Sequence, residues 1–341
     1  MLQNILFMFS YNDSLNWDVE LIKKSFSTGL QHCVHIFKEV FKEFEPIETE
    51  TPQTIYIDFK HNNYKYRLHL EDLVVPLRGQ DCKNWFVINQ ELVNEVDLSN
   101  FKYLDLVLCK TKYAYNLLLD LKKRNYDHKY NIYYTGFTSI SKNLIGVEPC
   151  YNRFLHVAGI SPFKNTRMIF ETWCNNPHWP ILTIIGHGCF FHENLPYFIQ
   201  PNIRIIPRVI LQSELKLHMN TTGIHIAASK AEGFGHYINE GRSVSALIIY
   251  TNHLPINEFF FSNQSAVPIE VSRLKDIGKL PGSKKAIITS KNLEGAVNNV
   301  LEMSLELRKK KGKLAYNAFI HDRIKFLDRI TKLKSRFIIN T

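Results

Sequence analysis

The second half of the chain alternates short apolar runs with amphipathic segments of helical period, and this alternation constrains the fold more than any other feature. Strands are predicted at residues 154–158, 181–185, 203–206, 224–228 and 246–250. Helices are predicted at residues 166–173, 213–219, 237–243 and 293–307. Such alternation is typical of a parallel sheet covered by helices on both faces, which binds ligands at the carboxyl ends of its strands. The second half is therefore predicted to be a Rossmann-like domain.

The first half shows similar elements less regularly. Strands are predicted at residues 5–9, 85–88, 104–109 and 131–134, and helices at residues 19–26 and 113–121. A polar stretch with proline and glycine, 138–152, separates the halves. The 341 residues are about twice the usual single-domain length of ~150. We expect an α/β protein with one domain at 1–150, a second domain at 151–310 and a basic helix or tail at 311–341.

Composition excludes several classes of protein. With 45% hydrophobic and 22% charged residues, the chain is neither disordered nor a coiled coil. Its longest apolar runs are far shorter than the ~20 residues that span a bilayer. The first residues lack the basic region and cleavage pattern of a signal peptide, so we expect a cytoplasmic protein. Six scattered cysteines indicate buried thiols, and we expect no metal site.

The positive charge is concentrated at the carboxyl terminus. Residues 308–341 contain eleven basic and two acidic residues and supply +9 of the net charge of +10. The rest is nearly neutral, which argues against a nucleic-acid partner. Apolar residues recur at helical intervals over 314–339, with lysine and arginine between them. This basic helix is expected to pack back on the amino-terminal domain, to make peripheral contact with an anionic membrane surface, or to do both.

The segment 229–240 carries the strongest indication of chemistry, because it follows a predicted strand and opens a helix. Gly233 and Gly235 allow a sharp turn, and the free N–H groups and dipole of the following helix favour a bound anion such as a diphosphate. Glu232 and Glu240 are separated by seven residues, so one carboxylate can face a sugar while the other accepts ribose hydroxyls. The alternative is a glycine turn with two surface glutamates, because short glycine motifs are weak indicators.

Two motifs resemble those of a known family. The run 232–235, Glu-Gly-Phe-Gly, with a second glutamate at 240 resembles the donor-site signature of retaining GT-B glycosyltransferases of the family-4 type, also called group 1. The run 154–165 resembles the strand, glycine turn and phosphate-binding lysine of the same family. Fainter similarity upstream, from about residue 85, indicates a divergent subgroup. The resemblance implies two Rossmann-like domains facing each other across a cleft, an acceptor-side domain at 1–150 and a nucleotide-sugar donor domain at 151–310.

The resemblance also implies an activity and its residues. It implies transfer of a sugar, with retention, from a UDP- or GDP-sugar to a hydroxyl of a glycan or other acceptor, with no separate cofactor. The catalytic candidates are Glu232 and Lys164. The donor-binding candidates are Gly159, Gly233, Phe234, Gly235, His236, Glu240, Arg208 and Val209. On the acceptor side the candidates are Asn89 and Glu91, the latter a candidate base.

Charge explains why these groups suit the reaction. A departing diphosphate carries negative charge, and Lys164 with the helix amides after Gly233 can stabilise it without a metal, each such donor typically contributing ~3 kcal/mol. The arginine that usually follows the first glycine is absent, since Ile160 and Ser161 stand there, and Asn165 replaces a glycine. One phosphate cation and one close backbone approach are therefore missing from the pattern.

Two other functions remain open. The missing arginine would also fit a degenerate GT-B protein kept as a binding or assembly subunit. A parallel sheet alone would also fit a dinucleotide-dependent oxidoreductase, but no Gly-x-Gly-x-x-Gly follows the first strand.

Overall fold

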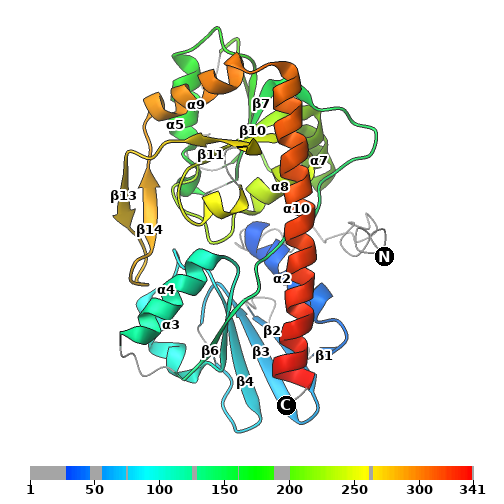
Figure 1. The fold of residues 1–341 in the computed structure, drawn as a ribbon, viewed down its shortest axis with the longest axis vertical. Helices are drawn as coiled ribbons and strands as arrows, with labels where there is room; N and C mark the ends of the chain where they lie inside the picture. The colour runs from blue at the N-terminus through cyan, green and yellow to red at the C-terminus, as the bar shows by residue number, and fades with distance from the viewer. Residues whose placement is uncertain are drawn as a thin grey trace. The chain divides into compact units, whose positions relative to one another are not determined.

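The computed structural model describes residues 28–46, 56–73, 76–124, 129–159, 161–187, 200–260 and 264–339. The strand expected at 5–9 and the helix expected at 19–26 lie outside these residues. The chain divides into two compact units (Figure 1). Unit 1 comprises Met1–Ile140, Ile277–Ser283 and Asp322–Thr341, and unit 2 comprises Ser141–Asp276 and Lys284–His321. The division thus lies at residue 140, within the predicted boundary stretch 138–152, and the carboxyl-terminal segment is shared between the units.

Unit 2 is built on a six-stranded sheet in which every neighbouring pair of strands is parallel. Its strands are β7 (Cys150–Gly159), β8 (Leu182–Gly186), β9 (Ile203–Ile206), β10 (Thr222–Ala227), β11 (Leu247–Thr251) and β12 (Ala266–Ile269). The spatial order is β12-β11-β10-β7-β8-β9. Counted from β7, this is the doubly wound order 3-2-1-4-5-6. The predicted Rossmann-like domain is confirmed, and all five predicted strands are present. Four of them agree with their expected bounds within two residues, whereas β7 begins four residues before its expected start.

Helices cover both faces of this sheet. Those of unit 2 are α5 (Thr166–Cys174), α7 (Gln212–Thr221), α8 (His236–Ser243) and α9 (Ser290–Glu302). On one face α5 and α9 enclose a core that includes Phe154, Trp173 and Val297, each no more than 1% exposed. On the other face, Tyr237 of α8 stacks on His225 of β10 with 5.8 Å between ring centroids.

The helix expected at 293–307 is wrong in its extent, because the structure contains two helices there. Thr289 and Asn292 form a capping box at the start of α9. The helix ends at Glu302, since Met303 is extended at φ −71° and ψ 142°. A new helix, α10 (Leu305–Lys334), then begins. An antiparallel hairpin, β13 (Arg273–Asp276) and β14 (Lys284–Ile287), was not predicted.

Unit 1 contains a second six-stranded sheet, in the sequential order β1 to β6. Its strands are β1 (Glu45–Pro46), β2 (Tyr56–His61), β3 (Tyr64–Leu70), β4 (Cys82–Ile88), β5 (Leu106–Cys109) and β6 (Asn131–Tyr134). The pairs among β1, β2 and β3 are antiparallel, whereas those from β3 to β6 are parallel. The helices are α2 (Thr28–Val40), α3 (Glu95–Asn100) and α4 (Lys112–Lys123).

The core of unit 1 is rich in aromatic rings. Phe59 stacks on Tyr66 with 4.9 Å between centroids, and Trp85 meets Tyr66 edge-on at 5.4 Å. Such pairs contribute about 0.5 to 1.5 kcal/mol each beyond the area they bury. Elsewhere in the unit, Phe86 and Leu118 are fully buried in the cluster that α4 closes. This packing fixes the positions of the parallel strands β3, β4 and β5 and of their carboxyl ends.

The basic tail forms a helix whose apolar side is buried. In unit 2, Ala315 and Phe319 are at most 1% exposed, and in unit 1 the same holds for Phe326 and Leu333. Phe326 meets Phe137 edge-on at 5.3 Å. After α10 the chain continues as a π-helical turn, Ser335–Ile339. The described helices include none with both the length and the apolarity to cross a bilayer.

Candidate active site

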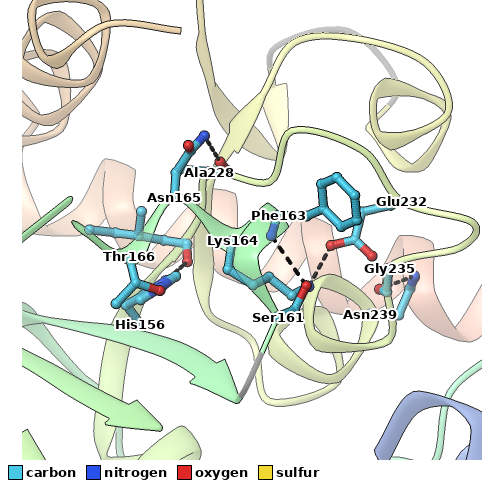
Figure 2. A network of polar contacts seen from close by, with 11 residues as sticks. His156, Ser161, Phe163, Lys164, Asn165, Thr166, Ala228, Glu232, Gly235 and Asn239 are labelled. Atoms are coloured by element: carbon cyan, nitrogen blue, oxygen red, sulfur yellow. Dashed lines mark hydrogen bonds and ion pairs between the residues drawn. The ribbon is translucent and has the colours of Figure 1, made fainter. Parts of the chain in front are cut away.

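Two loops of unit 2 leave the sheet side by side at the point where its strand order reverses. The strands β7 and β10 are neighbours at the centre of the sheet and run parallel, so their carboxyl ends lie at the same edge. Lys164 ends a short 3-10 helix, Pro162–Lys164, after β7, and Glu232 lies in the loop after β10. Their side chains form an ion pair, 17% and 14% exposed respectively. Figure 2 shows the ammonium and carboxylate groups pointing toward one another. The two candidate catalytic residues are therefore brought together.

Backbone contacts tie the same two loops to each other. The N–H of Lys230 donates to the carbonyl of Phe163 at 2.8 Å, and the Asn165 side-chain amide donates to the carbonyl of Ala228 at 2.7 Å (Figure 2). Asn165 itself has φ +57°, in the left-handed region that glycine adopts freely and asparagine tolerates best among other residues. Asn165 therefore permits the turn and adds a link between the loops.

The glycine turn leads directly into α8. Gly235 has φ +87° and is the N-cap residue of the helix, and a Cβ placed there would lie 3.1 Å from Ile238. As a glycine, Gly235 has no side chain with which to cap the helix. Gly233 is buried, and the Phe234 ring packs edge-on against Phe259 at 5.2 Å. The first N–H groups of α8 are thus positioned to bind an anion.

Glu240 lies deeper on α8, beside a lysine that the sequence did not single out. Its side chain is 7% exposed, and the Lys142 ammonium lies 3.7 Å from its Oε1. The same ammonium donates to Oε1 of Gln212, the first residue of α7, at 2.9 Å. A buried carboxylate therefore has a cation to balance its charge, which buried ionised groups require.

The donor-binding candidates Arg208 and Val209 lie in the loop before α7. Arg208 donates to Glu214 at 2.8 Å, and Val209 is 56% exposed. They follow β9, at the same edge of the sheet as Lys164 and Glu232, and stand a few residues before Gln212. None of the contacts described for Arg208 joins it to Lys164 or Glu232, so its guanidinium is not the second cation of that pair. Gly159 adopts φ +58° at the end of β7, as a turn there requires.

Unit 1 has its own polar cluster at the carboxyl ends of three neighbouring parallel strands. Glu71, Asn89 and Lys110 each stand immediately after a strand, β3, β4 and β5 respectively. The Asn89 amide donates to Glu71 Oε1 at 2.9 Å, and the Lys110 ammonium donates to Asn89 Oδ1. Burial raises the pKa of Glu71, while Lys110 and the Asn89 hydrogen bond oppose the shift. Glu91 takes no part in these two hydrogen bonds.

Sequence reasoning missed several residues that the fold places at these sites. Glu71 and Lys110 each follow an apolar strand immediately, and this position was the available signal. Lys142, by contrast, lies at the start of unit 2, in the polar stretch 138–152, and carries no motif. The described residues contain no group of three or more histidine, cysteine, aspartate or glutamate side chains that could hold a metal ion.

Comparison with known proteins identifies the fold. No family model and no curated protein matches the sequence. The crystal structure of the GtfA/B complex aligns with 75% of this chain and 53% of its own, at a TM-score of 0.58 and 13% identity. A glycosyltransferase from Rickettsia africae ESF-5 aligns with 77% of this chain and 72% of its own, at a TM-score of 0.55 and 15% identity. Anabaena Alr3699/HepE, in complex with UDP and glucose, aligns with 76% of this chain and 72% of its own, at 0.53 and 12%.

These structures share the GT-B fold with two Rossmann-like units, so the expected α/β fold class is confirmed. The chain spans about half the length of the GtfA/B chain with which it aligns. At 12 to 15% identity the likeness establishes the fold, and the assignment of an activity depends on the site itself.

Proposed function

We propose that the protein is a retaining glycosyltransferase that moves a sugar from a UDP- or GDP-sugar to a hydroxyl group of a glycan or other acceptor. The observation that carries this proposal is the Lys164–Glu232 ion pair at the switch point of the unit 2 sheet, beside the amino terminus of α8 with its glycine N-cap. Doubly wound sheets bind nucleotides at this position. The similar HepE structure contains UDP and glucose, and a GtfA structure contains UDP and GlcNAc.

In the proposed reaction the bond between the anomeric carbon and the diphosphate oxygen breaks while the acceptor oxygen bonds to that carbon on the same face. The acceptor proton passes to the departing diphosphate. The negative charge that develops on the diphosphate is met by Lys164 and by the N–H groups that begin α8, each worth about 3 kcal/mol when well placed. The chain's own groups thus supply the positive charge, and the proposed mechanism is metal-independent.

Glu232 acts on the sugar in this scheme. A bound diphosphate would compete with its carboxylate for the Lys164 ammonium, because both anions favour the same cation. Once displaced, the carboxylate lies beside the sugar, where positive charge develops at the anomeric carbon in the transition state. Glu232 therefore stabilises the oxocarbenium-like sugar while Lys164 stabilises the leaving group.

The nucleoside is assigned to the neighbouring part of unit 2. Glu240, whose charge is balanced by Lys142, accepts hydrogen bonds from the ribose hydroxyls. The loop that carries Arg208 and Val209 binds the nucleobase. Gly159, Gly233, Phe234, Gly235 and His236 line the diphosphate. On the acceptor side, we assign Asn89 with its partners Glu71 and Lys110, together with Glu91, to the recognition of acceptor hydroxyls. A carboxylate, an amide and an ammonium together supply both donors and acceptors for this purpose.

The proposal is tested with a panel of UDP- and GDP-sugars, by following the release of nucleoside diphosphate with and without hydroxyl acceptors. Slow hydrolysis of at least one donor without acceptor is expected, because water can replace the acceptor hydroxyl. Isothermal titration with UDP, GDP and NAD accompanies this assay. Binding of UDP or GDP without hydrolysis or transfer would favour a binding subunit, and binding of NAD alone would overturn the proposal in favour of an oxidoreductase.

A further inference from the structure

Three buried polar atoms gather at the carboxyl ends of β10 and β11 without a hydrogen-bond partner among the described residues. They are the Ser229 hydroxyl, the Thr251 hydroxyl and Nε2 of His253, on side chains that are 1%, 0% and 5% exposed. Buried polar groups are nearly always hydrogen-bonded, and an exception in a folded protein calls for an explanation. A buried polar atom without a hydrogen bond destabilises the folded state. The packing of the fold therefore gives no reason for three such atoms to lie at one edge of the sheet.

This edge adjoins the turn that carries Glu232. The strands β10 and β11 are parallel neighbours, with Ala227 opposite Tyr250, so the loops that follow them leave the sheet together. Ser229 lies near the start of the loop that carries Glu232, and the segment after His253 continues to Phe259, which packs on Phe234. The three atoms therefore lie in the part of unit 2 to which the donor is assigned.

The charge state of His253 decides which ligand it suits. Burial lowers the pKa of His253 to about 4. Backbone hydrogen bonds at Leu254 and Lys230 and the negative charge of Glu232 raise this pKa, but their combined effect is smaller. At neutral pH the imidazole is uncharged, with one nitrogen a donor and the other an acceptor. An uncharged ring adds little to the binding of a diphosphate but pairs readily with a hydroxyl group.

We propose that His253 hydrogen-bonds a hydroxyl group of the transferred sugar, and that Ser229 and Thr251 complete this sugar-recognition site. The inference rests on the proposed function and deepens it by naming residues that select the sugar. Lys164 and the start of α8 bind the charged diphosphate. The uncharged polar groups at the ends of β10 and β11 form hydrogen bonds with the hydroxyl groups of the sugar. Sugars that differ at one hydroxyl are distinguished strongly by sites of this kind, because the wrong sugar leaves a buried group unpaired.

The test separates recognition of the sugar from recognition of the nucleotide. In His253→Phe, which keeps a ring but removes both nitrogens, kcat/KM for hydrolysis of the best nucleotide sugar is expected to fall about tenfold or more. The affinity for UDP or GDP, measured by titration, should stay within about twofold of the unsubstituted protein. In His253→Gln, which restores a side-chain donor and acceptor, part of the loss should be recovered. The matched control is His225→Phe, at a fully buried histidine within β10. This substitution should leave the ratio of kcat/KM to nucleotide affinity unchanged.

A second variant keeps the test decisive if His253→Phe does not fold. Thr251→Val removes the hydroxyl at nearly constant volume. If this hydroxyl serves only the fold, the substitution should lower the melting temperature; if it serves a sugar, the melting temperature should hold or rise while kcat/KM falls. A folded His253→Phe with unchanged kcat/KM, or with equal losses for sugar and nucleotide, would overturn the inference and leave the proposed function standing. Absence of any UDP or GDP binding to the unsubstituted protein would remove both.

Discussion

The Lys164–Glu232 pair gives the two residues opposite effects on the donor nucleotide. In the proposed scheme the carboxylate competes with the diphosphate for one ammonium group. In Lys164→Ala, we expect the affinity for UDP or GDP to fall about tenfold or more and transfer to fall about 10²-fold. In Glu232→Gln, transfer should fall by a similar factor while nucleotide affinity holds or increases, because the competing charge is gone. Titration calorimetry measures the affinity, and nucleotide release measures the transfer.

A matched control is the pair between Lys284 and Asp276, which joins β13 and β14 at 2.6 Å and is largely exposed. In Lys284→Ala, one lysine and one ion pair of the same unit are removed, and both quantities should be unchanged. Equal losses of nucleotide affinity in Lys164→Ala and Glu232→Gln would contradict the competition between carboxylate and diphosphate.

At this scale the sequence predicted residues that stand in consecutive motifs and missed those that meet only through the fold. Glu232 and Glu240 are spaced on one segment, and Lys164 follows a glycine turn, so a pattern reveals them. His253 is recognisable only when its burial and its unpartnered nitrogen are known. Lys142 reaches Glu240 from 98 positions earlier in the chain, and no local pattern records such a contact.

At the scale of the element, two helical glycines should respond oppositely to the same substitution. A Cβ at Gly312 of α10 would lie 2.0 Å from the carbonyl oxygen of Ser245, whereas a Cβ at Gly295 of α9 would meet nothing within 4 Å. Gly312→Ala should therefore destabilise unit 2 by about 1 to 3 kcal/mol through overpacking. Gly295→Ala should stabilise it by about 0.5 to 1 kcal/mol, because alanine loses less entropy in a helix.

Urea unfolding at pH 7.5 distinguishes the two variants, and each serves as the control for the other. Gly312→Ala with unchanged stability would mean that α10 does not pack on Ser245 as described.

The strands and helices that were predicted correctly are those with one clear period. The strands of unit 2 are continuous apolar runs because helices bury both of their faces. The strands β2 and β3 were missed because they mix aromatic, charged and apolar residues, as in Tyr-Ile-Asp-Phe-Lys-His, and their charged partners Asp58 and Arg67 are buried against one another. The strand β13, Arg-Leu-Lys-Asp, is exposed throughout and has no apolar face to reveal it. Tertiary pairing, rather than local pattern, creates both hairpins.

A substitution on the buried side of α10 distinguishes a tail helix that packs on the protein from one that adsorbs to a membrane. Phe326 is fully buried against Phe137 within unit 1. In Phe326→Ala, the free energy of unfolding should fall by about 3 to 5 kcal/mol, as for other buried phenylalanines. The neighbouring exposed residue supplies the control, Lys325→Ala, which should change stability by less than about 0.5 kcal/mol. Unchanged stability in Phe326→Ala, with loss of sedimentation on phosphatidylserine vesicles, would instead indicate an undocked helix that binds membranes.

At the scale of the whole molecule, buried histidines should make the protein sensitive to mild acid. Burial lowers the pKa of His69, His156, His225 and His253 to about 4, from 6.5. The unfolded chain therefore binds more protons between pH 6.5 and 4, so stability is complete above pH 6.5 and is lost as the pH falls through this window. Each histidine contributes about 3 kcal/mol over the full window. The raised pKa of Glu71 acts in the opposite direction.

Urea titrations at pH 7.5, 6.5 and 5.5 measure this dependence. In His225→Phe, the slope of stability against pH between 6.5 and 5.5 should be shallower by about one proton. Equal stability at pH 7.5 and 5.5 would show that these imidazoles do not stay neutral in the folded protein.

The proposed function requires unit 2 to bind a nucleoside diphosphate at the junction of the loops after β7 and β10. The decisive measurement is a crystal structure with bound UDP or GDP. We expect the diphosphate on the first N–H groups of α8, with the Lys164 ammonium in contact with it and the Glu232 carboxylate displaced from that ammonium. A nucleotide bound elsewhere, or Lys164 still paired with Glu232 beside a bound diphosphate, would contradict it.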